Sequence, residues 1–213
     1  MNISYYFILS EMRKLFFFAI CIFLLQSCAI SNLQKTEKEF VPNKILNDQA
    51  SSYMYKAEIH IYDNYFSGLI VIKPKETGHR IVFMNEIGMK FFDFELSKES
   101  YIIHQIFEAM NKKIFIKLLV SDFKHILLYN VTGEFDYFTE KEEDSKILKP
   151  KKTKELYYFD KTFLSAQKSE KYSIFRKHTF INYSGYMQNI PGKINIEHKN
   201  IKFKMNLTYI KQK

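Results

Sequence analysis

Residues that could take part in chemistry are scattered through this 213-residue sequence. The histidines form no i,i+4 pair and no HExxH motif, so the sequence offers no recognisable metal-ligand cluster. There is no GxSxG nucleophile elbow and no phosphate-binding loop. We therefore predict no catalytic residue, no metal and no cofactor. Each histidine is expected at the surface or on an edge strand; the set is His60, His79, His104, His125, His178 and His198.

Two carboxylates, Asp93 and Glu95, alternate along one predicted strand and so share one of its faces. Lys90 or a neighbouring strand could neutralise them. A glycosidase-like pair of carboxylates meets only in the folded protein, so this enzymatic alternative stays open. The absence of any other catalytic pattern favours a protein that is not an enzyme.

The N-terminal region holds both cysteines of the chain, Cys21 and Cys28. Arg13 and Lys14 precede an uncharged apolar run, residues 15–25. A membrane-spanning helix needs roughly 20 apolar residues, so this run has the length of a signal-peptide core. Cys21 lies in the segment that would be removed, which would leave Cys28 without a disulfide partner. An ordinary buried helix and an uncleaved membrane anchor are the alternatives.

The stretch Leu25-Gln26-Ser27-Cys28 resembles a lipobox, the recognition site of bacterial lipoprotein signal peptidase. The resemblance implies that residues 1–27 are a signal peptide and that Cys28 carries a diacylglycerol that anchors the mature chain to a membrane. Residues 1–11 are interpreted as an upstream extension, with Met12 as the alternative start. Ala29 stands where an aspartate often retains lipoproteins in the inner membrane. We therefore expect a lipid-anchored outer-membrane protein that faces the periplasm.

The formal charge of +9 comes from an excess of lysine and arginine over acidic residues. Lysines close to a lipid anchor suit contact with anionic headgroups, each being worth about 1 kcal/mol. The lysines are spread along the chain and no nucleic-acid motif is present, so we expect no nucleic-acid partner.

Downstream of the signal, the pattern predicts a flexible tether over residues 28–50 and one β-rich domain over residues 51–213. Alternation of apolar and polar residues with a period of two predicts strands, and short turns between them describe an antiparallel meander. The predicted strands cover residues 53–62, 68–73, 80–85, 90–96, 101–106, 155–159, 172–175, 179–183, 193–198 and 201–210.

One segment departs from the strand pattern. Apolar residues recur at spacings of three and four between Asn111 and Leu128, which predicts an amphipathic helix. The charged residues 139–154 are interpreted as a solvated loop.

The expected fold class is α+β and mostly β: a curled antiparallel sheet, or incomplete barrel, with the helix packed on its concave face. One helix cannot cover a sheet of about eight to ten strands, so the sheet must curl or leave an apolar hollow. Such a hollow could bind a ligand or be filled by the protein's own side chains, and both alternatives stay open. The residues predicted to contact a ligand are Phe92, Phe94, Leu118, Phe123, Phe203 and Met205.

The segments 67–73, 80–83, 88–95 and the helix 111–128 together resemble the LolA/LolB-like half-barrel lipoproteins, and also an uncharacterised family of exported lipoproteins. The resemblance implies an incomplete antiparallel barrel with helices on its concave side. LolB-type receptors carry an exposed apolar residue on a loop between early strands. The corresponding turn, residues 73–79, has none, so the resemblance does not carry over that role.

These patterns lead to a functional hypothesis. The protein is expected to be a non-enzymatic outer-membrane lipoprotein that binds a hydrophobic ligand or a lipoprotein acyl chain. The alternative is an accessory or structural lipoprotein that docks on an envelope protein complex without a small ligand.

Overall fold

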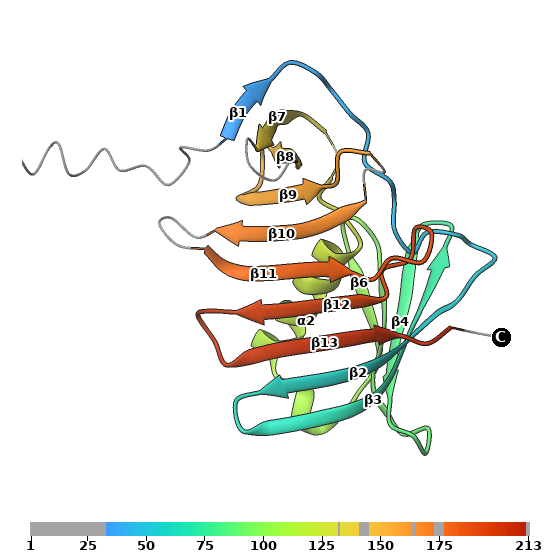
Figure 1. The fold of residues 1–213 in the computed structure, drawn as a ribbon. Coiled ribbons are helices and arrows are strands. Elements are labelled where there is room, and N and C mark those ends of the chain that lie inside the picture. The colour runs from blue at the N-terminus through green and yellow to red at the C-terminus, as the bar shows by residue number, and fades with distance from the viewer. Residues whose placement is uncertain (1–32, 132, 141–144, 163–164, 173–176, 212–213) are drawn as a thin grey trace, which may run out of the picture. The chain divides into compact units, whose positions relative to one another are not determined.

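A computed structural model describes residues 33–131, 133–140, 145–162, 165–172 and 177–211. Apart from Leu33, these residues belong to one compact unit, Gln34–Lys213. The described residues form one sheet of 13 strands, in the order β1-β7-β8-β9-β10-β11-β12-β13-β2-β3-β4-β5-β6 (Figure 1). From β7 to β6 in this order, neighbouring strands pair antiparallel.

The strands have the following bounds: β1 Leu33–Thr36, β2 Tyr53–Ile61, β3 Asn64–Lys75, β4 Gly78–Met84, β5 Lys90–Leu96, β6 Tyr101–Ile106, β7 Phe135–Glu140, β8 Lys146–Pro150, β9 Glu155–Phe159, β10 Ala166–Tyr172, β11 Lys177–Ser184, β12 Lys193–His198 and β13 Phe203–Tyr209. A 3₁₀ helix, η1 (Glu108–Met110), leads from β6 to the α-helix α2 (Lys113–Ile126).

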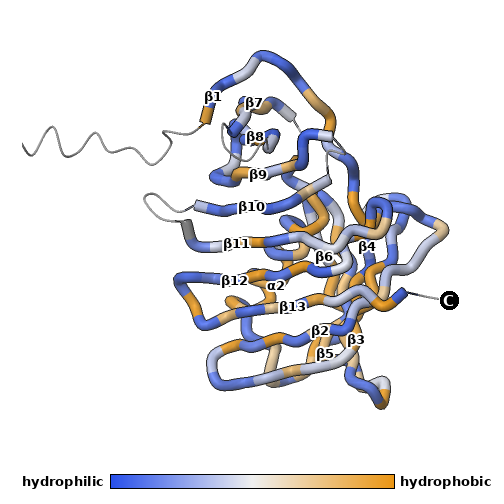
Figure 2. The backbone as a smooth tube through the Cα atoms, in the orientation of Figure 1, coloured by the Kyte–Doolittle hydropathy of each residue, from blue (hydrophilic) through white to orange (hydrophobic). Residues whose placement is uncertain are grey.

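The sheet curls around α2 without closing into a barrel, which confirms the predicted fold class. Phe123 of α2 lies 5.7 Å from Phe94 of β5, measured between ring centroids. Phe115, near the other end of the helix, lies 6.2 Å from Phe203 of β13. Strands from both sides of the curled sheet therefore contact the same helix. The hydropathy colouring shows apolar segments on the strands that surround it (Figure 2).

Burial alternates along the strands as a period of two requires. In β2, Tyr53, Tyr55, Ala57 and Ile59 are buried while Lys56 and His60 are exposed. The predicted helix is confirmed with slightly shorter bounds. Its buried residues recur at spacings of three and four, so the apolar stripe faces the concave side of the sheet.

A glycine permits tight packing of the backbone between two neighbouring strands. A Cβ atom added at Gly68 of β3 would lie 2.1 Å from the carbonyl oxygen of Met84, at the end of β4. Any side chain at this position would collide with main-chain atoms that cannot move independently. The sheet therefore needs a glycine here.

Three sequence-based expectations differ from the structure. The solvated loop predicted over residues 139–154 is wrong for residues 139–140 and 146–150, which belong to β7 and β8; residues 141–144 of that range lie outside the described residues. The sheet has more strands than expected, since β1, β7, β8 and β10 were not predicted. Of the strand predicted over residues 172–175, only Tyr172 lies in the described residues, and it ends β10.

Apart from Leu33, the described part of the predicted tether belongs to the compact unit. Ile45 and Leu46 are buried in the hydrophobic core. The Nε2 atom of His79 donates a hydrogen bond of 2.9 Å to the carbonyl oxygen of Leu46. Residues 40–47, which we call the strap, therefore pack on the end of the curled sheet where β4 begins.

Cys28 and the predicted signal peptide lie outside the described residues. Within the described part of the chain, the helices are too short or too polar to cross a membrane.

Candidate functional site

The interior beside α2 is filled by the protein's own side chains along much of the helix. Five of the six predicted ligand-contacting residues are buried in the hydrophobic core; they are Phe92, Phe94, Phe123, Phe203 and Met205. Phe92 stacks on Phe94 with a centroid distance of 4.8 Å, and Phe94 in turn meets Phe123 edge to face. This part of the hollow is thus self-filled.

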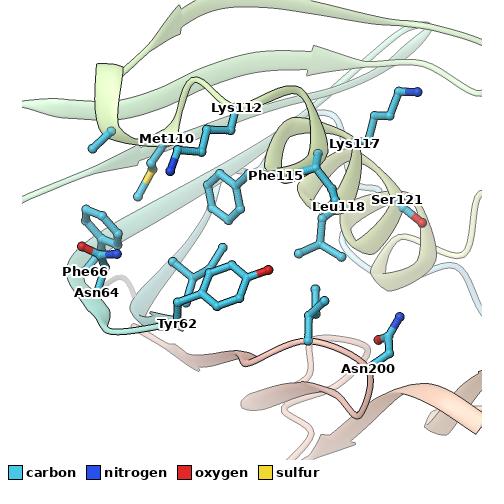
Figure 3. A pocket seen from close by; sticks show the side chains of 14 residues that line it. Tyr62, Asn64, Phe66, Met110, Lys112, Phe115, Lys117, Leu118, Ser121 and Asn200 are labelled. Atoms are coloured by element: carbon cyan, nitrogen blue, oxygen red, sulfur yellow. The ribbon is translucent and has the colours of Figure 1, made fainter.

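The sixth residue, Leu118, is only partly buried and lines a pocket of about 350 Å³ at the N-terminal end of α2 (Figure 3). The walls come from the β2–β3 turn, η1, α2 and the β12–β13 turn. The lining residues are Ile61, Tyr62, Asn64, Phe66, Ala109, Met110, Lys112, Ile114, Phe115, Lys117, Leu118, Ser121, Asn200 and Ile201. This volume lies at the lower end of the range of small-molecule sites, about 300–1,000 Å³.

The lining of this pocket is mainly apolar, and its polar side chains are Asn64, Asn200, Ser121 and the lysines Lys112 and Lys117. Met110, Phe115 and Leu118 face its interior, and the amides of Asn64 and Asn200 lie at its two ends (Figure 3). An apolar chamber with a few polar groups is typical of a site for a small hydrophobic molecule.

A hydrogen bond fixes two walls of the pocket to each other. Ile61 and Asn64 face each other across the β2–β3 hairpin, so Tyr62 and Asp63 form a two-residue turn. The N–H group of Tyr62 donates a hydrogen bond of 2.8 Å to the carbonyl oxygen of Lys202, in the β12–β13 turn. Both turns are therefore held in one arrangement at the mouth of the pocket.

Tyr62 adopts a left-handed backbone conformation with φ of 51°. This conformation costs about 1–2 kcal/mol for a residue with a side chain, and a turn of this kind favours glycine, asparagine or aspartate. The side chain is nevertheless exposed at the pocket mouth. Stability alone does not explain a tyrosine here, which points to a role for its side chain.

A partly buried polar cluster lies behind the Ser121 end of the pocket. The Nζ atom of Lys171 donates a hydrogen bond of 3.0 Å to Oγ of Ser121 and lies 3.5 Å from a carboxylate oxygen of Glu155. Burial alone would raise the pKa of Glu155, but nearby His125 and the other partners outweigh burial and lower it. The cluster therefore holds a charged pair just behind the pocket wall.

A second chain of polar contacts joins α2 to β12 and β11. His198 Nε2 donates a hydrogen bond of 2.9 Å to Asp122 Oδ2, and His198 Nδ1 lies 3.2 Å from Thr179 Oγ1. Burial raises the pKa of Asp122, although the hydrogen bond from His198 opposes this effect. An acid–histidine–hydroxyl chain can activate a nucleophile. Here Thr179 is buried and does not line the pocket, so the chain of contacts ties the helix to the sheet.

The expectation that every histidine lies at the surface or on an edge strand is wrong for three of them. His79, His125 and His198 are buried, because contacts distant in sequence place them between α2, the strap and the sheet. Neither ring nitrogen of His125 has a hydrogen-bond partner among the described residues. Burial lowers the pKa of His125 to about 4. Within the described residues, no group of His, Cys, Asp or Glu could hold a metal ion.

The carboxylates Asp93 and Glu95 are neutralised on the outer face of β5. Asp93 is 1% exposed and accepts hydrogen bonds of 2.9 Å from Arg80 Nε and 2.7 Å from Lys90 Nζ. Burial would raise the pKa of Asp93, but these bonds outweigh burial and lower it. Glu95 pairs with Lys75 and His104. The two carboxylates are thus held by cations, and Lys90 contributes as expected.

A second pocket, of about 380 Å³, lies at the C-terminal end of α2. The strap forms one wall, and Leu127, Leu128 and Tyr129 form another. The Nδ1 atom of His79 lies 2.8 Å from the hydroxyl of Tyr129, beside this pocket. The two pockets are therefore at opposite ends of the same helix.

Sequence reasoning missed Tyr62, Met110 and Ile114 at the first pocket. One signal was available: Ile114 is an apolar residue outside the buried stripe of an amphipathic helix. The contribution of the two turns could not be read locally, because they are far apart in sequence.

No protein-family model matches the sequence, and no curated protein matches it either. The fold is similar to the crystal structure of a DUF1329 family protein from Desulfovibrio piger, with a TM-score of 0.50 and 12% identity over 76% of this chain and 85% of that chain. A domain from Vibrio parahaemolyticus, described as an outer membrane lipoprotein-sorting protein, aligns with a TM-score of 0.47 and 9% identity over 78% of this chain and 86% of that chain. At such identities the first similarity establishes a shared fold.

Proposed function

We propose that the protein is a non-enzymatic, lipid-anchored protein of the outer membrane that faces the periplasm and binds a hydrophobic ligand or a lipoprotein acyl chain. The binding site is the pocket at the N-terminal end of α2. The observation that carries this proposal is an apolar chamber whose wall includes Leu118 and Phe115 and whose mouth is open to solvent (Figure 3). The similarity of the fold to a half-barrel is compatible with this use but does not specify it.

The test measures acyl ligands that copurify with the full chain. Native mass spectrometry and lipid extraction should detect a bound species, and a fluorescent fatty acid should displace it. Leu118→Arg should abolish both signals by placing a cation in the apolar chamber. Leu69→Arg, at a partly buried leucine of β3 that does not line the pocket, is the matched control. If the chain carries no lipid beyond its anchor and takes up no fatty acid, the proposal is wrong.

Anchoring is tested separately. Metabolic labelling with radioactive palmitate should mark the wild-type chain and fail for Cys28→Ala. Labelling of both chains, or of neither, would contradict lipidation at Cys28.

The alternative function, docking on an envelope protein complex, is favoured by β6. This strand is at one end of the sheet order, and Ile102 on it is 58% exposed. A free edge can accept a strand from a partner. Ile102→Lys should then remove a copurifying envelope protein, whereas Ile87→Lys, in the exposed β4–β5 turn, should not. Equal recovery of that protein with both variants would contradict docking through β6.

A further inference from the structure

Exposed apolar side chains surround the mouth of the pocket at the N-terminal end of α2. Ile114 is 74% exposed and Tyr62 is 59% exposed, and both line the pocket. Ile114 projects from the first turn of α2, and Tyr62 projects from the β2–β3 turn. The N–H group of Tyr62 is bonded to the carbonyl oxygen of Lys202, so the β2–β3 turn and the β12–β13 turn are fixed to each other beside the start of α2 and form one surface with it. We call this surface, with the lysines named below, the mouth surface.

Four exposed lysines belong to the mouth surface; they are Lys112, Lys113, Lys117 and Lys202. None of the four forms an ion pair within the described part of the chain. Two exposed carboxylates, Asp63 and Glu108, lie in the adjoining turn and in η1. The lysines outnumber the carboxylates, so the surface carries net positive charge around an apolar centre.

No acidic residue in the first turn of α2 offsets the positive charge of the lysines at its start. The N-cap of α2, Lys112, forms no side-chain capping bond. A helix N-terminus carries partial positive charge, so lysines there are electrostatically unfavourable. An anionic surface placed against the mouth would remove that repulsion. This is the charge complementarity expected of a docking surface for anions.

We propose that the mouth surface docks on an anionic lipid bilayer. Ile114 and Tyr62 enter the interface between headgroups and acyl chains, and the lysines contact the headgroups. Apolar and aromatic residues bordered by lysines are the composition that binds anionic membrane interfaces. In this orientation the pocket opens toward the acyl chains. The inference rests on the proposed function of the pocket, because it assigns the route by which the pocket receives its ligand.

The test uses the full chain reconstituted with vesicles. Because the proposed lipid anchor would hold this chain on a vesicle whichever way the domain faces, the readout must report which surface of the domain contacts the lipid. A photoreactive benzoylphenylalanine replaces Ile114 in one chain. In the control chain it replaces Ile87, which is 89% exposed in the β4–β5 turn. Vesicles consist of phosphatidylcholine alone or of equal parts phosphatidylcholine and phosphatidylglycerol. Mass spectrometry then measures the yield of lipid adduct after illumination.

Adduct at position 114 should exceed adduct at position 87 and should rise with phosphatidylglycerol. Each lysine contact is worth about fivefold in membrane binding, so K112E/K113E/K117E should reduce adduct at position 114 by at least about fivefold. The matched variant K149E/K152E/K154E, with the same change of charge at exposed lysines near the β8–β9 hairpin, should leave it unchanged. High salt should lower the wild-type yield without any substitution.

Equal adduct at positions 114 and 87, or a yield that ignores phosphatidylglycerol, would overturn the proposal. Adduct formation with a protein in cells, in place of lipid, would also overturn it. Failure of the proposed function is a separate result: fatty-acid uptake would be absent while adduct at position 114 stays dependent on anionic lipid. Fatty-acid uptake by a chain whose adduct at position 114 does not depend on anionic lipid would support the pocket as a ligand site and contradict the docking surface.

Discussion

Two substitutions on α2 distinguish the self-filled part of the interior from the pocket. Phe123 is fully buried and packs edge to face on Phe94 and Phe92 at 5.7 and 6.2 Å. Truncation of such a phenylalanine to alanine costs about 3–5 kcal/mol, because apolar contacts are lost and a cavity remains. Leu118 is only partly buried, so Leu118→Ala should cost about 1 kcal/mol, roughly half the value of a fully buried leucine.

The effects on ligand binding should follow the opposite order. Leu118→Ala should weaken fatty-acid binding by removing part of the pocket wall, whereas Phe123→Ala should not weaken binding under conditions where the variant is folded. The free energy of unfolding is measured by urea titration, followed by circular dichroism and by tyrosine fluorescence, since the chain contains no tryptophan. Binding is measured by titration of a fluorescent fatty acid.

The reasoning fails if Phe123→Ala costs less than about 1 kcal/mol, the typical cost of a point substitution, and also weakens binding. Phe123 would then line a ligand cavity. A large stability cost for Leu118→Ala with unchanged binding would equally contradict the assignment of the pocket.

Three further substitutions test the forces that hold the site. Gly68→Ala should destabilise the protein by about 1–3 kcal/mol in urea titration, because the new Cβ would lie 2.1 Å from the Met84 carbonyl oxygen; an unchanged midpoint would contradict the close approach. Burial lowers the pKa of His125 from 6.5 to about 4, so between these two pH values the unfolded chain binds a proton that the folded protein excludes. The free energy of unfolding should therefore be greatest above about pH 6.5 and should fall by up to about 3 kcal/mol as the pH drops toward 4. A His125→Leu variant that keeps the same pH profile would refute this. Arg80→Gln should cost about 1–3 kcal/mol by leaving buried Asp93 with Lys90 as its remaining partner, and an unchanged free energy of unfolding would show that Lys90 suffices.

Much of the fold follows from the period of the apolar residues. The strand bounds of β6, β9 and β12 match the predicted ranges, and the helix lies inside its predicted range. These elements bury one face or one stripe, so local alternation reports their position directly. In β13, Phe203, Met205 and Leu207 are buried while Lys204 and Thr208 are exposed, as the pattern predicts.

The strands β7 and β8 were not predicted, and they show under which conditions the alternation of apolar and polar residues fails to identify a strand. β7 and β8 contain Glu140, Lys146 and Lys149, whose charges suggested a loop. Phe135 pairs with Pro150, and Leu148 of β8 faces the core, so these strands form through contacts across the sheet. A strand near the end of a sheet can carry charged residues on its outer face, and the local sequence then resembles a solvated loop.

The candidate site was predictable only in part. Leu118 belongs to a helix whose stripe is visible in the sequence, and an apolar hollow was expected from the width of the sheet. The packing of Phe92, Phe94 and Phe123 on one another depends on how tightly the sheet curls, which alternation does not specify. Tyr62 and Lys202 meet through a hydrogen bond between turns far apart in the chain, so the mouth of the pocket could not be predicted.

The filled interior leads to a prediction about the length of the ligand. The two pockets lie at opposite ends of α2, and Phe92, Phe94 and Phe123 fill the space between them. An acyl chain in the first pocket therefore cannot continue along the helix, and any excess length must remain at the mouth. Each methylene that enters the pocket should contribute about 0.8 kcal/mol, or roughly fourfold in affinity, until the chamber is full.

Beyond that length the affinity of the full chain for a series of saturated fatty acids should stay constant, because additional methylenes gain no buried contact. Competition with a fluorescent fatty acid, below the concentration at which the longer acids form micelles, measures the series. Phe123→Ala opens a cavity at the inner end, so it should move the plateau to longer chains, whereas Leu69→Ala on β3 should not. An affinity that rises without limit in the wild-type protein would mean that the chain passes between the phenylalanines, and the interior would then be an extended tunnel that the side chains fill only in the absence of ligand.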